Sequence, residues 1–215
     1  MKTSHFSFLA LLSSITATVF LIQGCASTGI DRSQRARTTM QTMDNDIKLV
    51  SIQLDATGAS LDELMKPGHM DVKKAFDMYS DNVSTIEKME ANFSKHANEM
   101  KTRGKEYFEE WGKDGDAYKN PEIQALSVQR RSELGEIYGR IAENSVGVKD
   151  AFKTYVSDVK EVQTYLSNDL TTKGINAIEP VSRKVVYDGD NLKYAIKNVQ
   201  TAIDRARTEM AQNAK

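Results

Sequence analysis

The chain has 215 residues and a formal net charge of −1, with 29 lysines and arginines against 30 aspartates and glutamates. This length allows one domain or at most two small ones. The charges are interspersed, which argues against a nucleic-acid partner, because binding to phosphates requires a clustered positive field. Only three prolines and twelve singly spread glycines interrupt the chain, so the backbone is free to form long helices.

Residues 1–24 are predicted to form a lipoprotein signal peptide. Lys2 supplies a positive charge, and a mostly apolar stretch over residues 6–22 follows it, as in the hydrophobic region of secretory signals. The stretch runs into Ile22-Gln23-Gly24-Cys25, which resembles the bacterial lipobox. That resemblance implies cleavage before the cysteine and acylation of its thiol and of the new α-amine.

Cys25 is the lone cysteine of the chain, so it cannot form an intramolecular disulfide. We expect residues 25–30 to be a lipidated tether, since two or three acyl chains anchor a protein stably where a single chain binds only reversibly. Ala26, in place of Asp, implies sorting to the outer membrane of the bacterial envelope, facing the periplasm. The alternative is an uncleaved transmembrane anchor, for which residues 6–22 are at the lower limit of length.

Residues 31–66 are predicted to form the first helix, with Asp31 as its cap. Apolar residues recur there at alternating spacings of three and four, which is the a/d seam of a heptad repeat. Pro67 disfavours helical geometry in the residue before it and Gly68 permits a tight reversal, so the helix is expected to end at Lys66. Its seam comprises Met40, Met43, Ile47, Val50, Leu54, Thr57, Leu61 and Leu64.

Residues 69–111 continue the same alternation and predict a second helix. Glu90 and Gly104 fall on its seam and are its weak points. Gly112 and Gly115 stand among charged residues, so 112–120 is predicted to be a loop. The seam of this helix comprises Val72, Phe76, Tyr79, Val83, Ile86, Phe93, Ala97, Met100 and Tyr107.

A third helix is predicted over 121–170, because Asn120 can cap it and Pro121 is tolerated at the first helical position. A fourth is predicted over 180–212, opened by Pro180 after a break at Gly174. Asp188-Gly189 could be a turn inside it, but the seam stays in phase across this pair, which favours a continuous or kinked helix. The two seams comprise Leu134, Tyr138, Ile141, Ser145, Val148, Phe152, Tyr155, Val159, Val162 and Leu166, and then Val185, Leu192, Ile196, Val199, Ile203, Ala206 and Met210.

Short connections between successive helices force antiparallel neighbours. The sequence therefore predicts an all-α fold, an elongated antiparallel bundle of about four long coiled-coil-like helices over residues 31–213, behind a cleaved signal peptide. The pattern leaves open whether the bundle is closed or a pair of open hairpins. It also leaves open whether the seams are satisfied within one chain or between chains.

The sequence contains no recognisable pattern of catalytic or metal-binding residues. His69 and His96 remain after signal cleavage, and neither has the glutamate three residues earlier that metal sites in helical bundles use. No G-x-S-x-G turn and no glycine-rich phosphate loop is present. We therefore expect neither catalytic residues, metal nor cofactor, and a protein that is not an enzyme; His96 is interpreted as a solvated or boundary residue.

Four aromatic residues gather at the end of the second predicted helix and in the following loop: Tyr107, Phe108, Trp111 and Tyr118. Antiparallel pairing returns this group toward the tethered end of the first helix. It is a candidate membrane- or partner-facing tip, because Trp and Tyr favour the lipid interface. The favoured interpretation is that these rings close the end of the core, since large apolar patches seldom stay exposed.

Polar or small residues interrupt the seams. They either fix the register between helices or mark a groove for a partner helix, and the first use is the better attested. A basic cluster, Lys101, Arg103 and Lys105, stands among glutamates and is interpreted as a face of surface ion pairs. The interrupting residues are Thr57, Glu90, Gly104, Arg131 and Ser145.

The chain resembles a family of uncharacterised gammaproteobacterial lipoproteins that is described only as a domain of unknown function. The resemblance is carried by Ile22-Gln23-Gly24-Cys25, by the heptads over 40–65, by the helix end at Trp111-Gly112 and by the segment 180–210. It implies the fold and the envelope location, and it brings no catalytic residue, cofactor or substrate.

Two functions from different classes remain. The first is a non-enzymatic envelope lipoprotein that acts as a helical scaffold or protein-interaction module, with a membrane contact through its lipid and a protein partner or a second copy on its helices. The alternative is a carrier or chaperone-like bundle for a lipid or another apolar ligand, because methionines on the seam pack adaptably.

Overall fold

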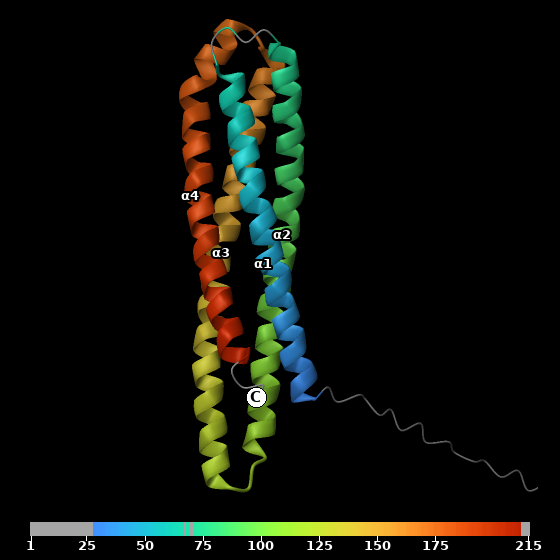
Figure 1. Cartoon of the computed structure of the whole chain (residues 1–215), viewed down its shortest axis with the longest axis vertical. Helices are drawn as coiled ribbons and strands as arrows, with labels where there is room; N and C mark the ends of the chain where they lie inside the picture. Colours follow the sequence, from blue (N-terminus) through green and yellow to red (C-terminus); the bar gives the residue numbers. More distant parts are fainter. Residues whose placement is uncertain (1–27, 67, 69–70, 212–215) are drawn as a thin grey trace, which may run out of the picture.

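A computed structural model describes residues 28–66, 68 and 71–211, which form four α-helices and no strand (Figure 1). The helices are α1 (Gly29–Leu64), α2 (Val72–Asp116), α3 (Pro121–Asn168) and α4 (Thr172–Ala211). They confirm the predicted all-α bundle. The predicted signal peptide over 1–24, the lipidation site Cys25 and the first part of the tether lie outside the described residues, as does His69.

The four helices form a closed, elongated ring. Among the described residues the backbone of α1 lies beside those of α2 and α4, and the backbone of α3 lies beside the same two helices, whereas the diagonal pairs meet through side chains in the core. Successive helices run antiparallel, and α3, with 48 residues, is the longest at about 72 Å for a rise of 1.5 Å per residue. The bundle is therefore closed and is not a pair of open hairpins.

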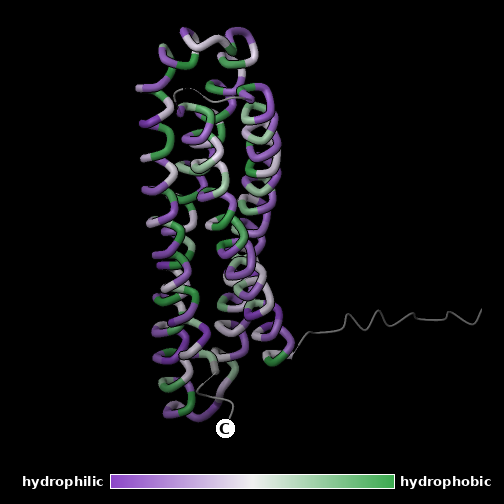
Figure 2. Tube along the Cα trace, turned by 45° about the horizontal axis from the view of Figure 1, so that its top comes forward, coloured by the Kyte–Doolittle hydropathy of each residue, from purple (hydrophilic) through white to green (hydrophobic). Residues whose placement is uncertain are grey.

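The predicted seams form the core. Hydrophobic and hydrophilic residues alternate along every helix (Figure 2), and the apolar seam side chains are buried or half-buried against the other helices of the same chain. The seams are therefore satisfied within one chain. The largest fully buried side chains are Tyr79, Phe93, Phe152, Met40, Met43, Ile47, Leu61, Leu64, Ile86, Met100, Ile141 and Leu166.

The start of α1 differs from the prediction, because Thr28 and not Asp31 is the cap. The Thr28 hydroxyl accepts a hydrogen bond from the Asp31 backbone N–H at 3.2 Å, and the Asp31 carboxylate accepts one from the Thr28 N–H at 3.1 Å. This reciprocal capping box satisfies two backbone donors at the helix start. The helix consequently begins at Gly29, within the segment that was assigned to the tether.

The predicted loop over 112–120 is wrong in its first half, since α2 continues through Gly112 and Gly115 to Asp116. Both glycines serve a close approach to α3. An ideal Cβ on Gly112 would lie 2.6 Å from the guanidinium of Arg131, and one on Gly115 would lie 3.0 Å from the Ser127 hydroxyl. These glycines leave room for side chains of α3 and do not end the helix.

The predicted start of the fourth helix at Pro180 is also wrong, since α4 begins at Thr172 and contains Pro180. Thr171 starts the helix earlier, because its hydroxyl accepts from the Gly174 N–H at 3.2 Å and its carbonyl from the Ile175 N–H at 2.9 Å. Proline then removes a single backbone donor, a loss that the packed helix accommodates. The helix is continuous through Asp188-Gly189, as the phase of the seam favours.

Candidate functional site

The candidate site is the end of the bundle at which α1 begins and α4 ends, which we call the open end. Two contacts define its level: Arg32 of α1 pairs with Asp114 of α2, and the Arg130 guanidinium of α3 donates to the Glu209 carbonyl of α4 at 2.9 Å. The α2–α3 hairpin extends past the start of α1 and the end of α4 (Figure 1). We call this projecting part, residues 115–129, the overhang.

Four large apolar side chains are exposed on the overhang. The exposed fraction is 43% for Tyr118, 48% for Ile123, 66% for Leu126 and 45% for Val128. Ile123 and Leu126 precede Arg130 by seven and four residues, so they share with it the face of α3 that packs on α4 farther along. Since α4 ends beside Arg130, it leaves this part of the α3 face uncovered.

Three of the four aromatic residues of the predicted tip lie together inside the open end. Tyr107 contacts Phe108 and Trp111, with ring centroids 5.0 Å and 5.6 Å apart. The Trp111 indole N–H donates to the Ser127 hydroxyl at 3.0 Å, and all three rings are half-buried. Tyr118 stands apart from them in the loop after α2. The three rings therefore pack against one another at the end of the core.

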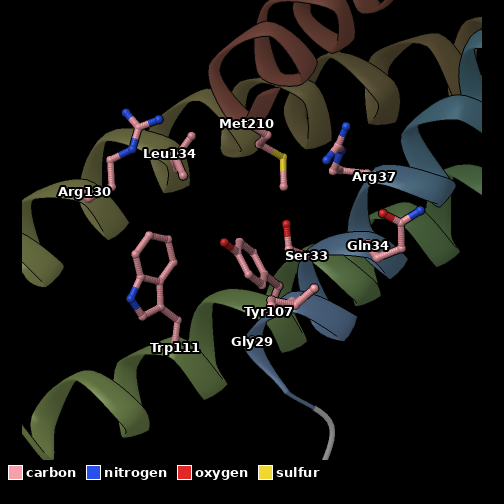
Figure 3. Close-up of a pocket in the computed structure, with 10 residues that line it drawn as sticks. Gly29, Ser33, Gln34, Arg37, Tyr107, Trp111, Arg130, Leu134 and Met210 are labelled. Carbon is pink, nitrogen blue, oxygen red and sulfur yellow. The ribbon is translucent and has the colours of Figure 1, made fainter. Parts of the chain in front are cut away.

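A cavity of about 620 Å³ lies beside these rings, where all four helices meet (Figure 3). Its apolar wall consists of Ile30, Tyr107, Trp111, Leu134 and Met210, and Leu134 is only 6% exposed. The remaining lining consists of Gly29, Ser33, Gln34, Arg37 and Arg130. The lining thus holds two guanidinium groups and no carboxylate.

The two arginines differ in their partners. Besides the Glu209 carbonyl, Arg130 has the carboxylates of Glu133 at 3.3 Å and Glu209 at 3.7 Å. Arg37 is exposed, and no ion pair or hydrogen bond joins its side chain to another described residue. The guanidinium of Arg37, on the α1 side of the cavity, is therefore the positive charge without an ion-pair partner among the described residues.

Burial raises the pKa of the Tyr107 hydroxyl, although this hydroxyl is hydrogen-bonded with Ser33.

Three of the five interruptions of the seams are occupied from within the chain. Gly104 receives the ring of Tyr138, whose hydroxyl donates to the Met100 carbonyl at 2.5 Å. The hydroxyls of Thr57 and Ser145, both buried, donate to carbonyls of their own helices at 2.8 Å and 2.7 Å. These three positions set packing and register, and they offer no groove to a partner helix.

The other polar features of the sequence have structural partners. Arg103 of the basic cluster pairs with Glu106 at 2.9 Å, and Lys105 pairs with Glu109 at 3.5 Å. His96 is a boundary residue whose Nδ1 lies 2.6 Å from the Asp46 carboxylate of α1. Among the described residues no three His, Cys, Asp or Glu side chains form a metal-binding group.

Sequence reasoning missed two polar features. One is Asp44, a buried carboxylate of α1 that accepts from Lys48 at 2.7 Å and from Gln200 of α4 at 3.0 Å. The other is the pair of arginines in the cavity. For the second, the sequence shows that Arg130 follows Ile123 by seven residues on one stripe of α3, but it does not show which part of α4 this stripe faces.

In the described part of the chain no helix has the length and apolar character needed to cross a membrane. Comparison with curated proteins and with solved structures gives no match. A family model described as a protein of unknown function, DUF2959, matches residues 30–212. This match covers almost all of the four helices.

Proposed function

Because the chain belongs to the DUF2959 family, whose description assigns no activity, we propose its function from the geometry of the open end. The protein is a non-enzymatic lipoprotein of the outer membrane, facing the periplasm and tethered through acylated Cys25. It acts as a helical scaffold or protein-interaction module that docks an envelope protein on the overhang.

The observation that carries this proposal is the exposed apolar surface of the overhang. Ile123 and Leu126 belong by their spacing to the buried face of α3, yet they are 48% and 66% exposed. Apolar side chains that gather on one uncovered surface are typical of interaction sites. The rest of the bundle satisfies its seams internally, whereas this continuation of the α3 face has no helix of the described chain packed against it.

The tether is supported by the residues before α1. Cys25 follows a hydrophobic segment within a lipobox-like sequence, and α1 begins four residues later at Gly29. A lipid on this cysteine would hold the open end near the membrane. Mass spectrometry of the protein purified from bacterial membranes tests this part: we expect a chain that begins at acylated Cys25, and a chain that begins at Met1 without acyl groups would refute it.

Docking is tested by in-cell cross-linking of two matched variants. Ile123→Ser/Leu126→Ser removes the apolar pair of the overhang, and Leu49→Ser/Ile52→Ser removes a similarly spaced pair on α1, whose members are 55% and 66% exposed. We expect the first variant to lose a cross-linked partner that the wild type and the second variant retain. Identical cross-linking patterns for both variants would remove the overhang from the proposal.

A second candidate, a carrier for a lipid or another apolar ligand, is supported by the cavity at the open end. The seam methionines Met40, Met43 and Met100 are fully buried against the neighbouring helices, so the centre of the bundle offers a ligand no room. Native mass spectrometry of protein purified from cells tests the carrier role: a bound amphiphile is expected, and apoprotein alone would contradict it.

A further inference from the structure

The cavity at the open end has walls that are held in place. Trp111 is fixed by its hydrogen bond to Ser127 at 3.0 Å and by its contact with Tyr107. Leu134 belongs to the buried core and Arg130 is bound to the end of α4. A volume of about 620 Å³ falls within the roughly 300–1,000 Å³ of small-molecule sites, which are usually preformed, mostly apolar and equipped with a few polar groups.

The apolar wall continues out of the cavity along α3. Leu134, Arg130 and Leu126 follow one another at intervals of four residues, so they form one stripe on this helix. Leu134 lines the cavity, whereas Leu126 lies beyond the end of α4 and is 66% exposed. A ligand with a long apolar chain could therefore extend from the cavity onto the overhang.

The positive charge of the cavity lining favours a negatively charged ligand. Arg37 and Arg130 reach it from α1 and α3 on opposite sides (Figure 3). Arg130 is already held by the carboxylates of Glu133 and Glu209, which leaves Arg37 as the guanidinium with no ion-pair partner among the described residues. Ser33 and Gln34 stand beside Arg37 on α1 and can add neutral hydrogen bonds.

We propose that this cavity binds a single-chain anionic amphiphile, a molecule with one hydrocarbon chain and a carboxylate or phosphate head group. The chain lies against Trp111, Leu134 and Met210, and the head group binds to Arg37. Guanidinium forms strong charge-assisted hydrogen bonds with both carboxylates and phosphates. This inference rests on the carrier candidate and deepens it by naming the ligand class.

The shape of the cavity disfavours a helical peptide as its occupant. An α-helix has a diameter of at least about 10 Å, so a volume of 620 Å³ would hold about one and a half turns of it. A neutral lipid would fill the apolar part but would form no charge-assisted hydrogen bond with Arg37. An inorganic anion alone would use the charge and leave the apolar wall without a role.

The experiment is photo-cross-linking of the full mature chain, purified from bacterial membranes and placed in nanodiscs of phosphatidylcholine. Three photoactivatable probes share one chain length: a fatty acid, a lysophosphatidic acid and an uncharged fatty alcohol. We expect the two acids to label peptides that contain Trp111, Leu134 or Met210, with saturation. The stronger of the two acids identifies the head group as carboxylate or phosphate.

Two arginine variants test the role of the charge. Arg37→Gln is expected to raise the half-saturating concentration of both acids by about tenfold, the effect of losing one charged hydrogen bond, and to leave the alcohol unchanged. Arg35→Gln is the matched control, because Arg35 is also exposed on α1 and lies outside the lining of this cavity. Equal effects of the two variants, or equal labelling by alcohol and acids, would overturn the anionic assignment.

A third variant tests the cavity itself. Met210→Trp at the end of α4 enlarges a half-buried lining side chain, and an unchanged melting temperature would verify the fold. We expect it to reduce labelling by all three probes. Undiminished labelling of this variant would refute the cavity as the binding site. If the wild type is labelled equally by the acids and the alcohol but Met210→Trp is labelled less, the anionic assignment is refuted and the carrier role stands.

Discussion

Replacing Gly104 by alanine should destabilise the bundle, although alanine is the better helix former. Gly104 lies on the buried side of α2 and faces the ring of Tyr138 on α3. An ideal Cβ at this position would lie 1.9 Å from Cε1 and 2.4 Å from Cζ of that ring. Both distances are far below van der Waals contact, so either the ring or the helix backbone has to move.

The cost follows from what holds the ring. Tyr138 is 5% exposed, and its hydroxyl donates to the Met100 carbonyl at 2.5 Å, so a shift of the ring also breaks this hydrogen bond. Overpacking of a core costs about 1–3 kcal/mol, and the lost hydrogen bond adds about 1 kcal/mol. The higher helix propensity of alanine offsets about 1 kcal/mol. We expect the free energy of unfolding to fall by about 2 kcal/mol.

Urea denaturation followed by circular dichroism at the helix band measures this difference. Gly139→Ala is the matched control, because no atom lies within 4 Å of its ideal Cβ and it should gain about 1 kcal/mol from helix propensity. In a double-mutant cycle, Tyr138→Leu should cost less in the Gly104→Ala background than in the wild type. If Gly104→Ala is as stable as Gly139→Ala, the account of the α2–α3 interface is refuted.

Two further predictions concern buried polar groups. Burial raises the pKa of Asp44, but hydrogen bonds from Lys48 and Gln200 outweigh it and hold this pKa below the ordinary 3.8. The carboxylate therefore stabilises the fold at neutral pH, and this effect is lost as the pH falls from about 4 through the lowered pKa. Asp44→Asn should lower the free energy of unfolding by about 2 kcal/mol at pH 7. Urea titrations should show that the difference from wild type shrinks below pH 4. Ser182 is 1% exposed and its hydroxyl has no hydrogen-bond partner among the described residues, so Ser182→Ala should raise stability by about 1 kcal/mol. That gain corresponds to about 2–4 °C in a thermal melt, and Ser145→Ala, which removes a satisfied hydroxyl, should give none.

The bundle and its core could be predicted because they depend on a pattern that each helix carries by itself. A heptad seam shows which residues of a helix turn inward, whatever helix lies opposite. Met40, Ile86, Ile141 and Ile196 are all 0% exposed, and each was identified from spacing alone. The cap at Asn120 and the proline after it are equally local, since the side chain bonds to the N–H of Glu122 at 2.9 Å.

Helix ends were harder to predict where a residue serves a neighbouring helix. Gly112 and Gly115 are common loop residues, and a single sequence does not show that Arg131 and Ser127 need the space beside them. Proline is a frequent first residue of a helix, which is why the helix was predicted to begin at Pro180. The cap at Thr171 instead starts α4 eight residues earlier. In both places the local propensity was correct and a tertiary or capping contact overrode it.

The open end depends on the register between helices, which no single heptad stripe contains. A shift of α3 by one heptad along α4 would bury Leu126 or uncover Leu134, and either change would remove the cavity. Two contacts between a glycine and a tyrosine fix this register, one on each side of α3: Gly104 receives Tyr138, and Gly189 would place a Cβ 2.9 Å from the ring of Tyr155. A bulky ring fits only where the facing helix lacks a side chain, so each pair permits one alignment along the interface. The length of the overhang and the position of Arg37 over the apolar wall both follow from these two alignments.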